Sequence, residues 1–434
     1  MSRRVVITGV GVISPLGNSA EKLWAGLSDG MSGVGELSAI PADAYPSRFG
    51  AEARDFTGSI DDFGPLDKAM SRNIKKNLKV MCREMQTGIA AAQLALTDCG
   101  LALDSANRDR IGCVYGSDYM LTLPQDFASG IRSCLDERGQ FDFSNWAEKG
   151  LPTVEPLWLL KYLPNLPASH IAIFNDLRGP NNSLTMREAS SNLALAEAYC
   201  TIVRGHADAM LAGATGSKIH PLRTVHAITQ EEIALRDGDP AKLSRPFDKH
   251  RCGSVVGEGA ACLVLEELEH AQTRGAKIFG EVIGHGASAV ADGRGVGQYK
   301  TAFGNVLKQC LKSAGVTPDQ IGHINAHGLS SRRCDAEEAQ AIGEIFGGRK
   351  SAVPVVAPKG NFGNLGAASG LVELISSLLA FQRGHLFPAL NYETPDSECP
   401  VNVVKDSSVV AGDVFINCNV SPQGQASAVV VRRF

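Results

Sequence analysis

Short apolar runs bounded by glycine alternate with helix-like segments along the whole chain. Such runs include RRVVITGVGV near the start, IGCVYGSD from residue 111 and HADAMLAGATG from residue 206. Apolar residues recur at helical spacing from Met85 to Leu96, and Gly100 follows, which predicts an amphipathic helix with a glycine stop. This alternation of strands and helices predicts the α/β fold class.

A similar order of elements returns in the second part of the chain. KIFGEVIGHGAS, the helix-like TAFGNVLKQCLKSAG, IGHINAHG and VPVVAPKGNFGN follow one another, then a helix from about Ala367 to Arg383 and the runs VFINCNV and ASAVVVRRF. We expect two halves, 1–255 and 256–434, in one compact body because no low-complexity linker separates them. A segment around 115–170, with Trp146 and Trp158, is predicted to be a lid or a dimer-facing insertion.

Composition excludes several classes of protein. The 434 residues are 44% hydrophobic and 20% charged with a net charge of -4, which indicates no nucleic-acid or membrane-surface partner. No run approaches the roughly 18 apolar residues of a membrane span, and the N-terminal run is interrupted too early for a signal peptide. Eleven cysteines lack CxxC spacing, which disfavours zinc ribbons and disulfide frameworks. We therefore expect a cytoplasmic protein without a metal ion or cofactor.

Sequence motifs distributed from end to end carry a family resemblance. VVITGVGVISPLG, RGPN, AGATGS, SRPFDKHRCGSVVGEGAACLVLEELEHAQTRGAKI, NAHG and PKGNFGN occur in this order. Together they resemble the β-ketoacyl-[acyl carrier protein] synthases, the condensing enzymes of fatty-acid and polyketide synthesis. The block that starts at Ser244 is long and ungapped, so it is highly specific. The resemblance implies a thiolase-like fold, with two similar halves in a layered α-β-α-β-α arrangement.

The resemblance also implies a set of reacting groups. In the family, a cysteine at a helix N-terminus accepts an acyl group, because the helix dipole stabilises its thiolate. Two histidines assist decarboxylation of a malonyl thioester, and a lysine orders the second of them. Backbone N–H groups, partly from a glycine-rich loop, form the oxyanion hole. An acyl carrier protein delivers the phosphopantetheine-linked acyl chain.

The position of the reactive cysteine holds Glu188. Alignment on RGPN gives Met186-Arg187-Glu188 where the family has Thr-Ala-Cys. Thr185 to Glu188 fits the S/T-x-x-E capping box, which would give the carboxylate a structural role at a helix start. As alternatives, the carboxylate acts as a general base or as an electrostatic plug in a former acyl pocket. If His327 lies nearby, Glu188 would raise the pKa of its imidazole and pair with it.

The first histidine motif is retained. NAHG supplies His327 as a candidate catalytic residue. The two threonines that touch the pantetheine arm in the family become Leu329 and Ser331, which are candidate substrate-binding residues. Asp335 and Glu338 match acidic positions that support this loop.

Two further parts of the family site differ. Lys359 matches the family lysine, but Asn364 stands where the second histidine is expected, and we expect these two to form a hydrogen-bonded structural pair. The Gly-Phe-Gly-Gly loop aligns with Ser421-Pro422-Gln423-Gly424. Pro422, a candidate substrate-binding position, has no N–H to donate. With the change at the cysteine position, these departures predict that ordinary condensation is lost, and they leave open whether the chain is an enzyme.

A basic cluster lies in SRNIKKNLK from Ser71. It contains Arg72, Lys75, Lys76 and Lys79. At helical spacing these side chains cover more than one face, so a solvated surface is the default interpretation. The family binds its acidic carrier protein near an equivalent stretch, which makes the cluster a candidate partner-binding patch.

Three functions fit this pattern, in order of preference. The first is a non-condensing homologue similar to the chain-length factors of type II polyketide systems, which pair with an active ketosynthase; those carry an amide at the cysteine position, whereas this chain has Glu188 and keeps His327. The second is an enzyme that uses these two residues on carrier- or CoA-bound acyl chains for malonyl decarboxylation, thioester hydrolysis or dehydration. The third is a scaffold that binds a carrier or lipid without chemistry. A stable homodimer would count against the first function.

Overall fold

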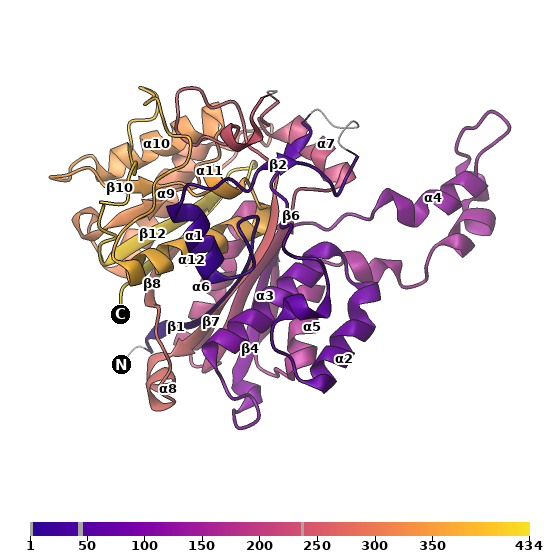
Figure 1. The fold of residues 1–434 in the computed structure, drawn as a ribbon, viewed down its shortest axis with the longest axis horizontal. Coiled ribbons are helices and arrows are strands. Elements are labelled where there is room, and N and C mark those ends of the chain that lie inside the picture. The colour runs from indigo at the N-terminus through magenta and orange to yellow at the C-terminus, as the bar shows by residue number, and fades with distance from the viewer. Residues whose placement is uncertain (1–2, 42–46, 236–237) are drawn as a thin grey trace.

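A large mixed sheet organises the molecule. The computed structural model describes residues 3–41, 47–235 and 238–434. The strands are β1 (Val5–Ile13), β2 (Gly35–Glu36), β3 (Phe49–Gly50), β4 (Ile111–Ser117), β5 (Asn181–Thr185), β6 (Ala209–Ser217), β7 (Glu258–Glu267), β8 (Gly280–Ala289), β9 (His323–Asn325), β10 (Pro354–Val356), β11 (Asn402–Val403), β12 (Val414–Val420) and β13 (Gln425–Arg432). An 11-stranded sheet has the order β11-β10-β9-β12-β13-β8-β1-β7-β6-β4-β5, and β2 and β3 form a small separate pair (Figure 1).

The same pairing pattern occurs twice in the large sheet. Strand β4 is parallel to β5 and β6, after which β7 and β1 continue antiparallel. Strand β9 is likewise parallel to β10 and β12, after which β13 and β8 continue antiparallel. The antiparallel pair β1–β8 joins the two sets. Two similar halves are therefore confirmed. The division at residue 255 stays a prediction. Strand β7 begins after that residue, yet it pairs with β6 and β1 of the first set.

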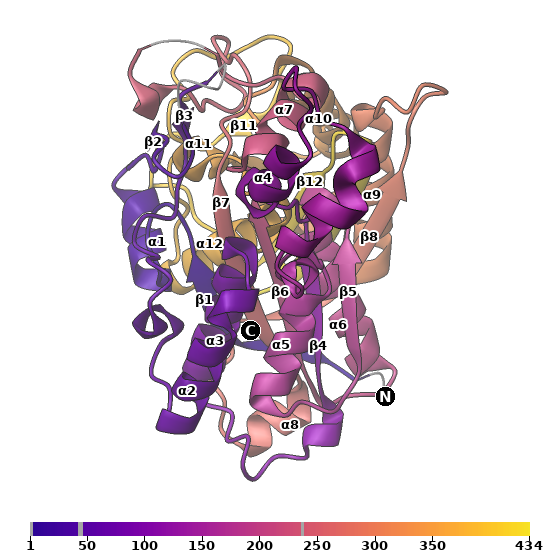
Figure 2. The same ribbon diagram turned by 90° about the vertical axis from the view of Figure 1, so that its right-hand side faces the viewer.

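Helices form three layers around the two sets of strands. They are α1 (Ala20–Ser28), α2 (Lys68–Asn77), α3 (Arg83–Cys99), α4 (Pro124–Ser133), α5 (Leu166–Asn175), α6 (Ser190–Val203), α7 (Pro221–Gln230), α8 (Leu268–Thr273), α9 (Tyr299–Ala314), α10 (Arg332–Phe346), α11 (Lys359–Phe362) and α12 (Ser369–Arg383). Helices α6 and α12 pack against each other and against both sets of strands, and α3 and α9 cover the outer faces. Figure 2 shows α3 and α5 side by side on one outer face. The α-β-α-β-α arrangement is thus confirmed.

Glycines end two of the predicted helices. Helix α3 stops at Gly100, which has φ 62°, and α9 stops at Gly315, which has φ 65°. In this left-handed region a Cβ would be strained, so glycine terminates the helix without cost to the backbone. Within the described ranges, no helix is both long enough and apolar enough to cross a membrane.

Residues 121–163, here called the arm, project away from the body (Figure 1). They contain α4 and several short helical turns. The rings of Phe127 and Trp158 lie 4.9 Å apart between centroids and help hold the arm together. Large apolar side chains remain exposed on it, namely Leu123, Ile131, Leu135, Phe141, Phe143, Leu151, Leu157 and Leu159. The arm falls within the predicted insertion, and its role as a lid or dimer contact stays a prediction.

Candidate functional site

Four candidate site residues meet in the centre of the molecule. Glu188 lies in a single 3₁₀ turn, Arg187–Ala189, directly before α6, and His327 follows β9. Lys359 begins α11 and Asn364 follows it. All four side chains are buried. Residues far apart in sequence therefore meet at one place, where the turn before α6 lies close to the segments that follow β9 and α11.

The local structure around Glu188 differs from the predicted capping box. Thr185 ends β5, and the hydroxyl of Ser190 accepts a hydrogen bond from the N–H of Met186 at 2.8 Å. The Glu188 carboxylate bonds side chains instead. The capping-box prediction is therefore wrong: Ser190, not Glu188, accepts from the Met186 N–H, and the Glu188 carboxylate turns inward.

Glu188 belongs to a buried ion network. Its Oε1 lies 2.5 Å from Lys218 Nζ and accepts a hydrogen bond from Asn364 Nδ2 at 3.1 Å. Lys218 Nζ also contacts Glu231 Oε1 at 2.7 Å. Arg187 lies 2.6 Å from Glu231 and 3.8 Å from Glu188. Two carboxylates and two cations thus balance one another. We call Arg187, Glu188, Lys218 and Glu231 the Glu188 network.

The network keeps Glu188 ionised. Burial alone would raise the pKa of Glu188, but the positive charges of Lys218 and Arg187 outweigh burial and hold this pKa well below its ordinary value. Burial likewise opposes the charge on Lys218, yet Glu188 and Glu231 raise its pKa. A carboxylate whose pKa is lowered in this way is a weak base, so it is poorly suited to proton abstraction near neutral pH.

His327 has a different environment. Its Nδ1 faces two donors, Lys359 Nζ and Asn419 Nδ2, each at 3.4 Å, which assigns the ring proton to Nε2. Burial, followed by the charge of Lys359, holds the pKa of His327 well below 6.5, while Glu188 acts in the opposite direction. Glu188 thus raises the pKa of His327 as predicted, although burial and Lys359 outweigh it. The predicted Glu188–His327 pair is wrong, because Glu188 pairs with Lys218 instead.

Acidic side chains support the His327 loop as predicted. Glu338 accepts hydrogen bonds from the N–H groups of His327 at 2.7 Å and Gly328 at 2.9 Å. Asp335 accepts from the N–H of Leu329 at 2.9 Å. The loop turns sharply, because Gly328 has φ 44°. These bonds satisfy buried backbone groups that the tight turn would otherwise leave unpaired.

Lys359 and Asn364 do not form the expected pair. Lys359 Nζ bonds the Glu373 carboxylate and donates to the carbonyl of His327 at 2.7 Å. Asn364 Oδ1 accepts from the N–H of Gly366 at 3.1 Å, while its amide donates to Glu188. The prediction of a Lys359–Asn364 hydrogen bond is wrong, since each side chain has another buried partner.

Glu188, Glu231 and His327 border one cavity. It has a volume of about 150 Å³. Its walls contain Glu188, Gln230, Glu231, Glu232, Tyr299, His327, Leu329, Ser331, Arg333, Cys334, Val420, Ser421 and Pro422. The predicted substrate-binding positions Leu329, Ser331 and Pro422 therefore lie beside the predicted catalytic ones. Pro422 lies in the turn between β12 and β13, and its carbonyl accepts from the Tyr299 hydroxyl at 3.2 Å.

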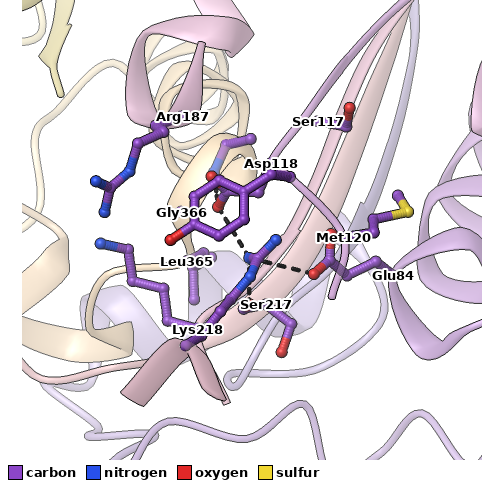
Figure 3. Close-up of polar contacts among 12 residues, drawn as sticks. Glu84, Ser117, Asp118, Met120, Arg187, Ser217, Lys218, Leu365 and Gly366 are labelled. Atoms are coloured by element: carbon purple, nitrogen blue, oxygen red, sulfur yellow. Dashed lines mark hydrogen bonds and ion pairs between the residues drawn. The ribbon is translucent and has the colours of Figure 1, made fainter. Parts of the chain in front are cut away.

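The cations of the Glu188 network also border a second, very small space. It measures only about 10 Å³ and is lined by Asp118, Tyr119, Arg187, Lys218, Arg223 and Glu231. Figure 3 shows Arg187 and Lys218 on one side of this region and Asp118 on the other. Arg223 Nη1 lies 3.2 Å from Asp118 Oδ2. An apolar chain would find neither room nor an apolar surface there.

Comparisons with known proteins identify the family. The model described as "Beta-ketoacyl synthase, N-terminal domain" matches residues 2–271, and that described as "Beta-ketoacyl synthase, C-terminal domain" matches residues 279–393. The chain belongs to the β-ketoacyl synthase family. A Synechocystis 3-oxoacyl-[acyl-carrier-protein] synthase 2 is 32% identical over 414 residues, which cover 94% of this chain and 92% of that one.

Two solved structures of β-ketoacyl synthase type cover 100% of both chains at a TM-score of 0.84. One is a beta-ketoacyl synthase from Burkholderia phymatum, 27% identical in sequence. The other is described as the ishigamide ketosynthase/chain length factor and is 26% identical. The fold inferred from the motifs is therefore the fold of this family.

Sequence reasoning missed the cations that neutralise Glu188. Lys218 directly follows the apolar run of β6 and is buried, and Glu231 directly follows α7. A lysine placed directly after an apolar strand was an available signal, but nothing in the sequence pairs it with Glu188. The basic residues Arg72, Lys75, Lys76 and Lys79 lie exposed in and just after α2, and their role as a carrier-docking patch stays a prediction.

Proposed function

We propose that this β-ketoacyl synthase homologue does not condense acyl chains and serves as a chain-length-factor-like partner subunit of an active ketosynthase. The observation that carries the proposal is Glu188, a buried, ion-paired carboxylate at the position that the resemblance gives to the nucleophilic cysteine. The family chemistry needs a thiolate there.

Glu188 is a poor substitute for that thiolate. Acyl transfer to a carboxylate would give a labile anhydride, and here Lys218 and Arg187 also draw on its negative charge. Breaking the contact with Lys218 would leave buried charges without partners, which is costly. Of the roles considered for Glu188, namely helix cap, general base and electrostatic plug, the plug explains the carboxylate best. Glu188 then acts as a fixed structural anion.

The space around Glu188 supports the same conclusion. The cavity that Glu188 lines measures about 150 Å³, and the neighbouring space among Arg187, Lys218 and Arg223 measures about 10 Å³. Drug-sized ligands use pockets of about 300 Å³ or more. A long acyl chain bound in this subunit would have to displace ion pairs. An acyl chain held between this chain and a partner would not.

The arm supports a subunit role. Its exposed apolar side chains, with Phe143 at 73% exposure, form a surface that water solvates poorly. One protein of the same fold at 26% identity is described as a ketosynthase/chain length factor. A heterodimer with an active ketosynthase would cover such a surface, and the partner would receive the acyl chain from its acyl carrier protein. The basic cluster on α2 would then assist carrier docking.

One observation favours a second candidate. His327 keeps its supporting loop and has a ring N–H available on Nε2 beside the 150 Å³ cavity. That N–H could stabilise the enolate formed when a malonyl thioester loses CO₂, with a proton from water completing the acetyl thioester.

Co-expression tests the proposal. A tagged active ketosynthase from the same genome should retain this chain in a 1:1 complex on size exclusion with light scattering. Phe143→Ser with Phe141→Ser should weaken retention, whereas Val410→Ser, at a site of 68% exposure outside the arm, should not. A stable homodimer that ignores the ketosynthase would contradict the proposal. Conversion of malonyl carrier to acetyl carrier by this chain alone would favour the second candidate.

A further inference from the structure

A pocket lies on the outer face of the first half, where α2 and α5 pack against each other beside α3 (Figure 2). Its walls come from α2, from the segment 101–108 after α3 and from the end of α5. Its volume is about 440 Å³, within the range of about 300–1,000 Å³ that is usual for sites of small organic ligands. Within the described ranges, it has no lining residue in common with the Glu188–His327 cavity.

Asn175 supplies an unpaired acceptor to this pocket. It ends α5, lines the pocket and is 4% exposed. Its Nδ2 donates to the carbonyl of Ile171 at 2.9 Å, which fixes the other end of the amide as the oxygen. Among the described residues, no donor reaches this Oδ1. A buried acceptor without a donor is unfavourable, so a donor on a ligand would stabilise it.

The guanidinium of Arg108, which also lines the pocket, already has partners. Its Nη2 lies 3.1 Å from Asp104 and its Nη1 lies 3.5 Å from Asp176. It also donates to the carbonyl of Leu103 at 3.1 Å and to that of Asn175 at 3.0 Å. An anionic ligand would have to compete with all of these acceptors, so Arg108 does not make the pocket a site for anions.

Asp67 adds a carboxylate without a cation. Its Oδ1 accepts from the N–H groups of Ala69 at 2.7 Å and Met70 at 2.8 Å and thereby caps α2. In the part of the chain that the structure describes, no cation pairs with Asp67 and no donor reaches its Oδ2. Lys68 and Arg72 of the same helix are exposed and do not line the pocket. A cationic ligand would therefore meet an unpaired negative charge here.

The remaining walls are apolar. They contain Met70, Leu101, Leu103 and Phe174, and the ring of Phe174 is largely covered by the protein. These side chains offer a hydrocarbon surface beside the unpaired acceptors. A ligand that fits both parts carries a donor group on an apolar body.

We propose that this pocket binds a small organic molecule with a protonated amine on a short apolar body. The ammonium group donates to Asn175 Oδ1 near the negative charge of Asp67, and the apolar body covers Leu101 and Leu103. An ammonium has three N–H donors and no acceptor, which suits a pocket with unpaired acceptors. The site is separate from Glu188, and the inference does not rest on the proposed subunit function.

Binding of 2-phenylethylamine to the full-length protein tests this inference, with 2-phenylethanol and 3-phenylpropionate as neutral and anionic probes of similar shape. Methyl carbon-13 labelling of methionine reports on the pocket, since Met70 lines it, and Met70→Leu assigns the resonance. We expect a saturable shift of the Met70 methyl with the amine at low salt. The alcohol should bind about tenfold more weakly, because its hydrogen bond is not assisted by charge, and the anion more weakly still.

Variants separate the charge from the acceptor. Asp67→Asn keeps a side chain that caps helices well, so it should weaken amine binding by about fivefold and leave alcohol binding unchanged. Asp61→Asn, at an exposed position outside the pocket, changes the net charge equally and should have no effect. Asn175→Ala should weaken binding of both the amine and the alcohol by about tenfold.

A pocket-filling variant locates the binding. Ala69 is exposed on the wall, so Ala69→Trp should abolish the shift of the Met70 methyl without loss of the fold, which circular dichroism checks. Two results would overturn the site: no saturable shift with the amine up to its solubility limit, or binding that survives Ala69→Trp. Binding of the alcohol or the anion as tight as that of the amine would overturn the assigned ligand class, as would equal weakening by Asp67→Asn and Asp61→Asn.

Discussion

The two sides of the central cavity differ in how closely they match the arrangement that the family resemblance implies. On the His327 side, Glu338 and Asp335 still hold the loop through backbone N–H groups, and Lys359 still contacts the imidazole. On the Glu188 side, the position assigned to the nucleophile carries a carboxylate fixed by Lys218. One side matches the arrangement that the family resemblance implies, and the other side is an ion network.

The difference teaches which contacts the fold itself needs. The His327 loop turns through left-handed residues, so its N–H groups need acceptors whether or not His327 reacts. The Glu188 side chain bonds no backbone N–H of the turn before α6, and Ser190 accepts from the Met186 N–H there, so the Glu188 side chain can change without loss of the helix start. A reactive group can therefore be replaced on one side while the supporting shell of the other is retained.

The largest expected effect comes from the Glu188 side. Lys218→Met should lower the free energy of unfolding by about 3–5 kcal/mol, because Glu188 and Glu231 would then be buried with too little positive charge. Urea denaturation measures the change. The double variant Lys218→Met with Glu188→Gln should recover part of the loss. A loss below about 1 kcal/mol, the range of exposed ion pairs, would mean that the network does not hold Glu188.

A smaller loss is expected on the His327 side. Glu338→Gln replaces one carboxylate oxygen with a donor that faces a backbone N–H, so we expect a loss of about 2 kcal/mol in urea denaturation. Glu344→Gln on the same helix is the matched control, since Glu344 pairs with Lys300 at the surface and should contribute less than about 1 kcal/mol. Equal losses in the two variants would remove the distinction between loop support and surface charge.

Some of this comparison could be predicted from the sequence. Apolar runs and glycine stops were enough for the strands and for α3, since burial and backbone conformation act locally. The acidic support of the His327 loop followed from motif position. The prediction of a Lys359–Asn364 pair was wrong because Lys359 binds the carboxylate of Glu373, one turn into α12, and no local sequence pattern indicates that contact. Lys218 reaches Glu188 only because β6 and α6 pack together.

The two sides should also respond oppositely to pH. Burial raises the pKa of Glu338 from 4.5 to about 8, so its contribution to stability is present below pH 4.5 and is lost as pH rises through 8. The pKa of Glu188 is lowered instead, so its contribution is present above 4.5 and is lost as pH falls below that value. Unfolding free energies of wild type, Glu338→Gln and Glu188→Gln across this range measure both trends. The same sign for both would contradict the account.

The smallest effect is expected on the binding of a carrier protein at the basic cluster of α2. Lys75→Glu with Lys76→Glu on α2 should weaken binding of an acidic carrier protein by roughly tenfold at low salt and less at 0.15 M, because exposed charges are screened. Fluorescence anisotropy with a labelled carrier measures it. Lys308→Glu with Lys312→Glu on α9 changes the net charge equally at another exposed surface. Equal weakening by both pairs would argue against a docking patch on α2.

Intact-mass spectrometry of the complex with an active ketosynthase, after incubation with acyl and malonyl carriers, tests the central claim most directly. The account predicts an acyl adduct on the ketosynthase and none on this chain, and no change in the carriers when this chain is incubated alone. An acyl adduct on this chain, or carriers consumed by it alone, would contradict the account of Glu188 as a fixed structural anion.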